Sequence, residues 1–183
     1  MTSPTPSPPA PVLVLNDLSW SVGGAVIVDG VSMTVSDGEF LAVIGPNGAG
    51  KTSLFNLVSG LTRPTRGTVE LLGTDITRLP PHRRARLGLG RTFQTSSVFA
   101  DLSVGANVGL AVQARLGESR RFWQRATPVT GPEISRVLDL VRLSHRADAL
   151  AGDLSHGDKR KLELALLLAR EPRVILLDEP WPG

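Results

Sequence analysis

Residues 45–52 read Gly-Pro-Asn-Gly-Ala-Gly-Lys-Thr, and this stretch decides the fold. It follows a continuous apolar run at residues 40–44 and opens a helical pattern at residues 51–59. Backbone N–H groups can close around a phosphate only where side chains do not intrude, and the N-terminus of a helix favours anions. The stretch therefore predicts a phosphate-binding loop, made of Gly45, Pro46, Asn47, Gly48, Ala49, Gly50, Lys51, Thr52 and Ser53.

Two side chains of this loop carry the predicted chemistry. Lys51 would reach the β- and γ-phosphates of a nucleoside triphosphate, and the hydroxyl of Thr52 would ligate Mg²⁺. The alternative is a glycine-rich turn that matches the pattern without binding anything. Every fixed position of the pattern is present in the expected strand-to-helix setting, which favours the functional interpretation.

A second apolar run, residues 174–177, ends in Asp178-Glu179-Pro180. A carboxylate at the end of a strand can hold Mg²⁺ through water, which predicts this role for Asp178. The neighbouring carboxylate of Glu179 can polarise an attacking water. An acid after an apolar run also marks many ordinary strand ends, and the upstream phosphate loop favours the catalytic interpretation.

Between these motifs lies Leu154-Ser155-His156-Gly157-Asp158-Lys159-Arg160, which opens an apolar helix at residues 158–169. One interpretation is a capping box, in which Ser155 caps the helix and Asp158 reaches back from the third position. The other is a second anion site, built from Ser155 Oγ, the Gly157 N–H and the helix N-terminus. Both can hold together.

The N-terminal half reads as a proline-rich tail and then a sheet. Residues 1–11 contain many prolines and no charge, so we expect disorder there and folding from residue 12 onward. Turns at Gly23-Gly24 and Asp29-Gly30 predict hairpins in an antiparallel sheet formed by residues 12–15, 26–28 and 31–35. Residues 40–44 are typical of a strand buried on both faces, and residues 68–72 of a further strand.

The C-terminal half is predicted to be mainly helical. Residues 82–87 suggest a short basic helix and residues 89–93 a strand leading to Gln94. We expect a helical lobe over residues 98–153, with a polar surface connection at residues 117–132. Its two helices are predicted at residues 104–115 and 134–143.

Composition excludes several classes of protein. The chain has 183 residues, 41% of them hydrophobic, no cysteine and three scattered histidines, so it has no disulfide and no spacing typical of a transition-metal site. No apolar run approaches the roughly 20 residues that cross a bilayer, and no secretory signal precedes the fold. Arginine dominates the basic residues and clusters at Arg83, Arg84, Arg86 and Arg91, which leaves nucleic acid or an acidic membrane face as alternative partners.

The order and spacing of four motifs resemble the ATP-binding subunit of an ABC transporter. They are the phosphate loop, Arg91-Thr92-Phe93-Gln94, Leu154 to Asp158, and the run ending in Asp178-Glu179. The resemblance implies an α/β fold, a P-loop NTPase core with an antiparallel β lobe and a helical insertion, in which the C-terminal part of the core sheet is missing. The sequences around Gln94 and Ser155 most resemble subunits of branched-chain amino acid importers, with urea importers as near relatives.

The resemblance also implies a shared site. Two ATP-binding subunits, identical or different, would sandwich ATP and Mg²⁺, and Ser155 and Gly157 of one would contact the γ-phosphate held by the other. Gln94 would contact Mg²⁺ or the attacking water, and Glu179 would be the catalytic base. The expected partners are transmembrane permease subunits, which would hold the chain at the inner face of the cell membrane, and indirectly a solute-binding protein outside. Nucleic acid is not an expected partner.

Three departures from the family pattern are visible. Val22 stands where an aromatic residue usually stacks on adenine, and Trp20 nearby could substitute. His156 and Asp158 replace the commoner Gly and Gln. The chain stops at residue 183, before the family's next strand and histidine, so we expect a gap in the central sheet and poor ATP hydrolysis by this chain alone. The alternatives are a non-catalytic remnant and an ABC-type ATPase that acts on nucleic acid.

Overall fold

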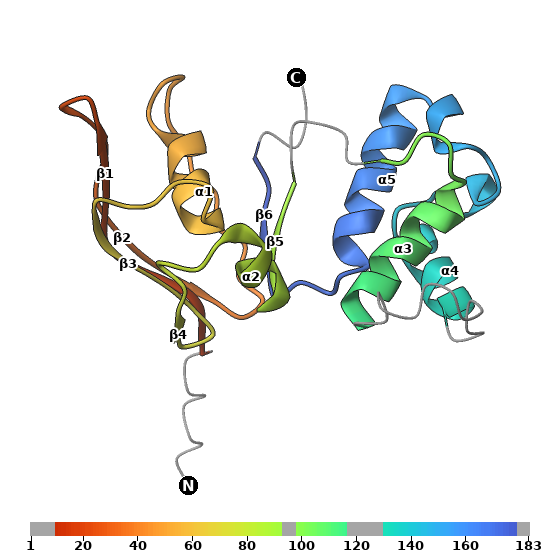
Figure 1. The fold of residues 1–183 in the computed structure, drawn as a ribbon, viewed down its shortest axis with the longest axis horizontal. Helices are drawn as coiled ribbons and strands as arrows, with labels where there is room; N and C mark the ends of the chain where they lie inside the picture. The colour runs from red at the N-terminus through yellow and green to blue at the C-terminus, as the bar shows by residue number, and fades with distance from the viewer. Residues whose placement is uncertain (1–9, 93–97, 117–129, 179–183) are drawn as a thin grey trace, which may run out of the picture. The chain divides into compact units, whose positions relative to one another are not determined.

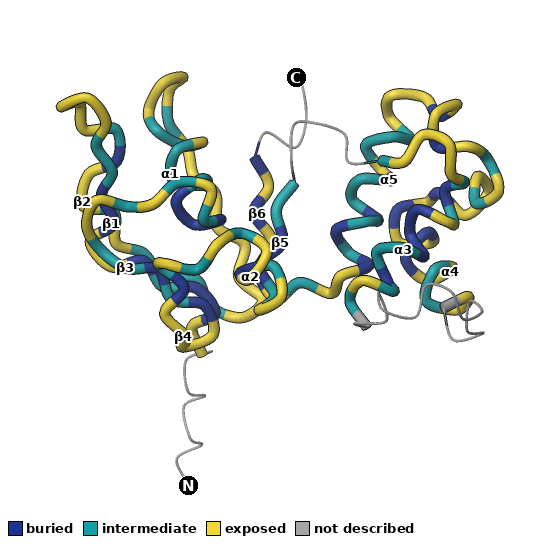
Figure 2. Tube along the Cα trace, in the orientation of Figure 1, coloured by how far each residue is buried: buried dark blue, intermediate teal, exposed yellow. Residues whose placement is uncertain are grey.

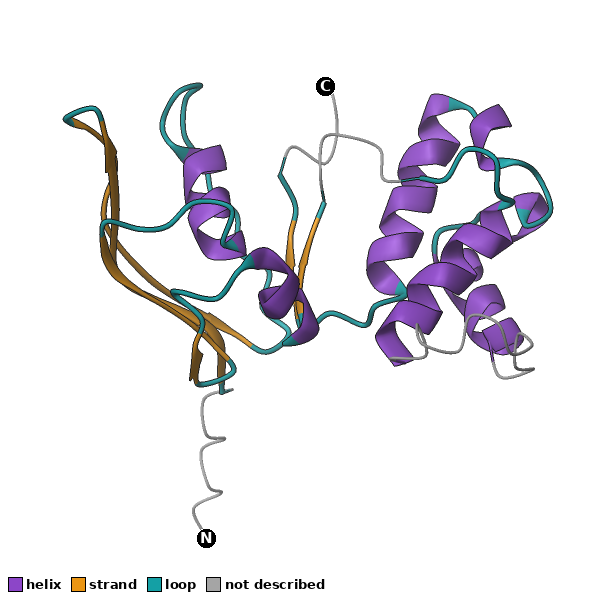
Figure 3. Cartoon of the chain, viewed as in Figure 1, coloured by secondary structure: helices purple, strands orange, loops and turns teal. Residues whose placement is uncertain are grey.

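The computed structural model describes residues 10–92, 98–116 and 130–178. The chain divides into two compact units, Met1–Leu89 and Gly90–Gly183, and each is described by itself. The first holds a four-stranded sheet and two helices, and the second is mainly helical (Figures 1 and 3). The predicted tail lies outside the described residues up to residue 9, and the first strand begins at Pro11.

An antiparallel sheet with the order β2-β1-β3-β4 forms most of the first unit. Its strands are β1 (Pro11–Val22), β2 (Ala25–Ser36), β3 (Arg66–Leu71) and β4 (Thr74–Asp75). The predicted hairpin at Gly23-Gly24 is confirmed, and both glycines have positive φ, 56° and 82°. A turn of this hand matches the right-handed twist of the two long strands that it joins.

The predicted second hairpin at Asp29-Gly30 is wrong. Strand β2 continues through Gly30, whose φ of 58° marks a bulge, and the register of β1 with β2 shifts there. Opposite it, Asp17 of β1 also has a positive φ, 50°. Paired irregularities bend two strands and increase their twist without ending them, and a turn-like dipeptide can produce either outcome.

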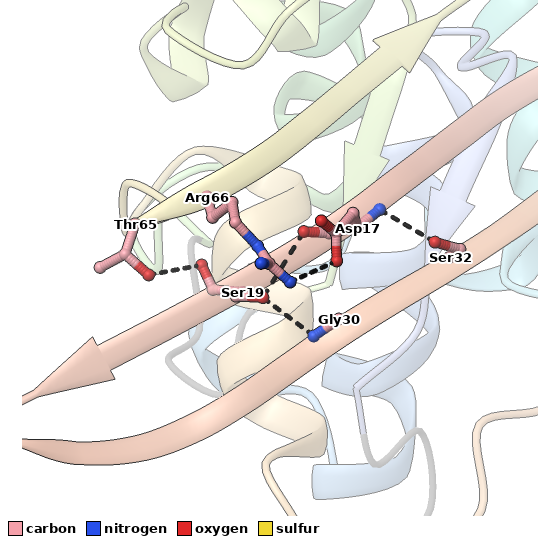
Figure 4. A network of polar contacts seen from close by, with 6 residues as sticks. All are labelled: Asp17, Ser19, Gly30, Ser32, Thr65 and Arg66. Atoms are coloured by element: carbon pink, nitrogen blue, oxygen red, sulfur yellow. Dashed lines mark hydrogen bonds and ion pairs between the residues drawn. The ribbon is translucent and has the colours of Figure 1, made fainter.

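Side chains from three strands hold this bulge in place (Figure 4). Gly30 N–H donates to Ser19 Oγ at 2.9 Å, and Asp17 N–H donates to Ser32 Oγ at 2.9 Å. Arg66 Nη2 pairs with Asp17 Oδ1 at 2.7 Å. These bonds satisfy backbone groups that the irregular register leaves outside the strand ladder.

The predicted strand at residues 40–44 is also wrong. Residues 39–46 have no strand or helix conformation, and Phe40 and Ile44 are 86% and 92% exposed. A strand forms only when neighbouring strands accept its backbone hydrogen bonds, and none of the described strands pairs with this segment. The apolar run therefore has the composition of a buried strand, but in the structure it pairs with none of the described strands.

Two helices of the first unit follow the prediction. Helix α1 (Lys51–Ser59) ends at Gly60, whose φ of 80° is the left-handed stop expected there, and α1 contacts β2. Helix α2 (Pro81–Arg86) starts with proline, which the first turn tolerates. Arg84 of α2 is only 1% exposed. A buried guanidinium cannot contact a polyanion, so the nucleic-acid alternative loses one residue of its cluster.

The second unit packs three helices around one core. They are α3 (Val104–Leu116), α4 (Thr130–Leu140) and α5 (His156–Leu168), with short 3₁₀ turns η2 (Ser144–Arg146) and η3 (Ala151–Asp153) between α4 and α5. Buried residues at helical spacing meet in the middle, as the dark stretches of α3 and α5 indicate in Figure 2. The core members are Val104, Val108, Val112, Val137, Leu138, Val141, Leu143, Ala151, Leu154, Leu162, Ala165 and Ala169.

Boundaries in this unit differ slightly from expectation. Helix α4 begins inside the predicted surface connection, because Gly131 and Pro132 occupy its first turn, where proline costs no hydrogen bond. It ends three residues early, and Arg142 with a φ of 56° follows. Residues 117–129 of that connection lie outside the described residues.

A two-stranded sheet pairs β5 (Leu89–Arg91) with β6 (Val174–Leu176). In the apolar run at residues 174–177, Ile175 and Leu177 are exposed while Val174 and Leu176 are buried. This alternation is typical of a strand with one covered face. Among the described helices, none is long and apolar enough to cross a membrane.

Candidate functional site

The predicted phosphate loop lies between an extended segment and α1. Gly48 and Gly50 have φ values of 83° and 85°, and Ala49 N–H donates to Pro46 O at 3.2 Å to close a tight turn. A Cβ on Gly50 would lie 2.7 Å from the carbonyl oxygen of Ile27 in β2. Residue 50 must therefore be glycine both for its backbone angle and for the close approach of β2.

The loop is open to solvent on its outer side. Asn47, Gly48 and Ala49 are exposed, as is Thr52 in the first turn of α1. The first N–H groups of a helix have no intrahelical acceptor, and in α1 the first helical bond is donated by Leu54 to Gly50 O at 2.8 Å. The N–H groups before Leu54 are thus oriented along the helix axis, as a bound anion would need.

Lys51 folds back over this loop. Its Nζ donates to Gly45 O at 2.6 Å and to Pro46 O at 2.8 Å. Two neutral carbonyls are weaker partners for an ammonium group than a phosphate would be. The side chain is therefore anchored at the loop and is able to exchange carbonyl oxygens for phosphate oxygens.

Ser155 is the N-cap of α5, as predicted. Its Oγ accepts a hydrogen bond from Asp158 N–H at 3.1 Å. Gly157 is exposed, and a Cβ there would meet nothing within 4 Å. The helix end therefore presents a hydroxyl and an open backbone N–H to solvent, which is the chemistry of an anion site.

The Asp158 side chain forms an ion pair within α5. Its Oδ1 accepts from Lys161 Nζ at 2.8 Å, one turn along the helix. This bond, with a smaller contribution from the hydroxyl of Ser155, lowers the pKa of Asp158 below 3.8. The carboxylate also stands in the first turn, where negative charge complements the helix dipole.

Asp178 follows β6 by two residues and is almost completely buried. Its Oδ2 lies 3.1 Å from Nη2 of Arg91, at the end of β5. The exposed fractions of the two side chains are 7% and 9%. The predicted catalytic residues Gln94 and Glu179 lie outside the described residues, so only Asp178 of that carboxylate pair has a described position.

Two predicted site residues carry the type of ligand atom that Mg²⁺ binds. Mg²⁺ prefers oxygen ligands, usually one or two from the protein with water and phosphate completing the shell. The exposed Thr52 hydroxyl in the first unit is such an oxygen, and so is the Asp178 carboxylate in the second. Within the described ranges, no three His, Cys, Asp or Glu side chains gather as a protein-only metal site.

The structure describes both residues that the sequence suggests for the adenine contact. Val22 is exposed at the end of β1, and Trp20, two residues earlier, is half-buried opposite Val28 of β2. Trp20 stays a prediction for the residue that stacks on adenine.

Two arginines have positions that sequence reasoning missed. Arg91 was noted only as part of a motif and of a basic cluster, yet it is the ion-pair partner of Asp178. Arg84 belongs to the same basic cluster in the sequence, yet it is buried. The sequence does place Arg91 at the end of a short predicted strand. A charged side chain that is buried there needs a partner of opposite charge, and this requirement could have pointed to the ion pair.

Comparison with known proteins gives a consistent picture. The family model for ABC transporters matches residues 28–181. The chain is 34% identical over 180 residues to BraF, a high-affinity branched-chain amino acid transport ATP-binding protein of Pseudomonas aeruginosa, covering 94% of this chain and 71% of that protein. It is 44% identical over 159 residues to LptB, a lipopolysaccharide export system ATP-binding protein of Acidithiobacillus ferridurans, covering 86% and 62%.

A solved structure shows the same fold. The crystal structure of an ATP-binding cassette of an ABC transporter in its ADP conformation superposes with a TM-score of 0.77 at 29% identity, covering 95% of this chain and 70% of that one. This likeness confirms the α/β fold with an antiparallel lobe and a helical part. The chain spans from 56% to 71% of the length of the curated relatives it matches here.

Proposed function

Because the chain belongs to the ABC transporter family as one of its ATP-binding proteins, we propose that it binds and hydrolyses ATP to drive solute transport. The observation that carries the proposal is the loop at residues 45–52. Its two left-handed glycines, its helix N-terminus and its anchored lysine meet the requirements of a triphosphate in one short segment. The reaction would be hydrolysis of the β–γ phosphoanhydride bond.

Each residue of the site has a role in this proposal. The residues from Gly45 to Gly50 and Ser53 cradle the phosphates with backbone groups, and Lys51 neutralises charge on the β- and γ-phosphates. Thr52 and Asp178 hold Mg²⁺, which when bound offsets the negative charge of the phosphates. Gln94 orients Mg²⁺ or the attacking water, and Glu179 accepts a proton from that water.

We further propose that the site is shared by two subunits. Ser155 and Gly157 stand exposed at the N-terminus of α5, so they are accessible to a phosphate brought by a second ATP-binding subunit. Nucleotide would then be bound between two chains, identical or different. Permease subunits would hold the pair at the inner face of the membrane.

Binding of the fluorescent nucleotide mant-ATP by the purified chain tests the central proposal. Lys51→Met should weaken binding at least about tenfold, because a charge-assisted bond to phosphate is lost. Arg83→Met removes an exposed positive charge from α2 and should leave the affinity within about twofold. Equal affinities of all three proteins would refute the proposal.

The same titration with Ser155→Ala separates the shared site from the loop. We expect mant-ATP affinity of the monomer to be unchanged, since the phosphate loop is intact. ATP-dependent dimerisation, measured by analytical ultracentrifugation in the presence of Mg²⁺, should be lost. Dimerisation that is as strong as in the unsubstituted chain would exclude Ser155 from the shared site.

We propose branched-chain amino acids as the solute and import as the direction. The proposal is supported by the sequences around Gln94 and Ser155 and by the similarity to BraF. A second candidate is lipopolysaccharide export, which the higher identity to LptB favours.

Disruption of the gene decides between the two candidates. Loss of uptake of radiolabelled leucine, with normal lipopolysaccharide at the cell surface, is the expected result. Normal uptake with lipopolysaccharide retained inside the cell would favour the export role.

A further inference from the structure

Arg91, at the end of β5, and Asp178, two residues after β6, form a buried ion pair. Nη2 of Arg91 lies 3.1 Å from Oδ2 of Asp178, and both side chains are more than nine-tenths buried. Burying either charge alone would cost several kcal/mol, so each group depends on the other. The pair therefore fixes where the Asp178 carboxylate lies before any cation arrives.

The backbone around Arg91 leaves it little freedom. Thr92 N–H donates to Leu176 O at 3.1 Å, which ties the end of β5 to the end of β6. At Gly90 a Cβ would lie 2.7 Å from Leu167 Cδ1 and 3.0 Å from Pro172 Cβ, so β5 is pressed against the end of α5. Arg91 thus projects from a strand held on two sides.

We propose that Arg91 is the resident counter-ion of Asp178 and thereby sets how tightly the site takes a divalent cation. The inference rests on the proposed nucleotide site, in which Asp178 is an oxygen donor for Mg²⁺. Two cations that share one carboxylate repel each other, so the guanidinium opposes entry of Mg²⁺. The negative charge of a triphosphate offsets that repulsion, which links cation binding to nucleotide binding.

Arg91 is a positioning residue in this scheme, because it acts on the cation through Asp178. Its ion pair joins the ends of β5 and β6, two strands that pair in one sheet. A purely structural role would change stability alone. A counter-ion role changes the cation dependence of nucleotide binding as well.

The test is the Mg²⁺ concentration that half-saturates mant-ATP binding. In Arg91→Gln we expect this concentration to fall roughly three- to tenfold, because a like charge near the cation is removed. Arg91→Lys keeps the charge and should stay within about twofold of the unsubstituted chain. Arg170→Gln, an exposed charge at the end of α5, is the matched control and should also stay within about twofold.

A double-mutant cycle shows whether the effect passes through Asp178. In an Asp178→Asn background, where the Asp178 carboxylate is removed, adding Arg91→Gln should change the half-saturating Mg²⁺ concentration by less than about twofold. An unchanged or higher half-saturating concentration in Arg91→Gln, or a shift that persists beside Asp178→Asn, would overturn the inference. If the unsubstituted chain binds no mant-ATP at any Mg²⁺ concentration, the proposed function fails and the inference with it.

Discussion

Replacement of the buried Arg84 by methionine is the sharpest test of what holds the phosphate-loop helix in place. The guanidinium donates four hydrogen bonds, all to backbone carbonyls. Nη1 bonds to Leu57 O and Val58 O at 2.8 and 2.7 Å, in the last turn of α1. Nε and Nη2 bond to Leu79 O and Thr77 O at 2.9 and 2.8 Å, in the segment before α2.

The magnitude follows from these four bonds. A hydrogen bond from a charged donor contributes at least about 1.5 kcal/mol, so four contribute about 6 kcal/mol. Removing the buried charge recovers its desolvation cost of about 3 kcal/mol, a cost that is also seen in the pKa of Arg84, which burial lowers to about 10. We therefore expect Arg84→Met to lower the free energy of unfolding by about 3 kcal/mol.

Urea denaturation followed by far-UV circular dichroism measures this loss. Arg83→Met is the matched control, because Arg83 is the exposed neighbour of Arg84 in the same helix and its loss should cost under about 0.5 kcal/mol. If both variants unfold at the same urea concentration, Arg84 does not hold the end of α1. A selective loss would also confirm that this arginine has a structural role and no surface role.

Three further outcomes are expected. Gly50→Ala should abolish mant-ATP binding, because its Cβ would lie 2.7 Å from Ile27 O. The control is Gly48→Ala, whose Cβ would meet nothing within 4 Å, and it should weaken binding much less. Equal effects of the two substitutions would contradict the close approach of β2. Asn107→Ala should lower the free energy of unfolding of the helical unit by about 2 kcal/mol, measured by urea denaturation. The buried amide of Asn107 accepts from Phe99 N–H at 2.9 Å and donates to Phe99 O at 3.0 Å. A loss below about 0.5 kcal/mol would exclude that role. Lys161→Gln should raise the pKa of Asp158 toward 3.8, measured by NMR titration of its carboxyl carbon. Because the folded pKa lies below the unfolded one, this group's stabilisation is complete above about pH 4 and is lost as pH falls through the folded pKa.

Local patterns in the sequence predicted what depends on nearest neighbours. The glycine pattern at residues 45–50, the left-handed stop at Gly60 and the cap at Ser155 all rest on backbone angles and bonds within one turn. The hairpin at Gly23-Gly24 is of the same kind. The order of four motifs carried the family resemblance, and the comparisons confirm the family and the fold.

Those local patterns did not predict how segments that are far apart in the sequence pair with one another. The apolar run at residues 40–44 has the composition of a buried strand, yet it lies unpaired, since strand formation requires a partner that composition does not supply. The Asp29-Gly30 dipeptide reads as a turn, and only the register of β1 against β2 makes it a bulge.

By itself, then, the sequence determined the family and predicted a phosphate-binding loop, because the residues of that loop are eight consecutive positions. Only the tertiary structure decided that Arg84 is buried and that Arg91 faces Asp178, 87 positions away in the chain. A charge is compatible with solvent or with a buried partner, and its own sequence neighbours do not distinguish the two environments. The fold does, because it brings the partner carboxylate or carbonyl to the charge.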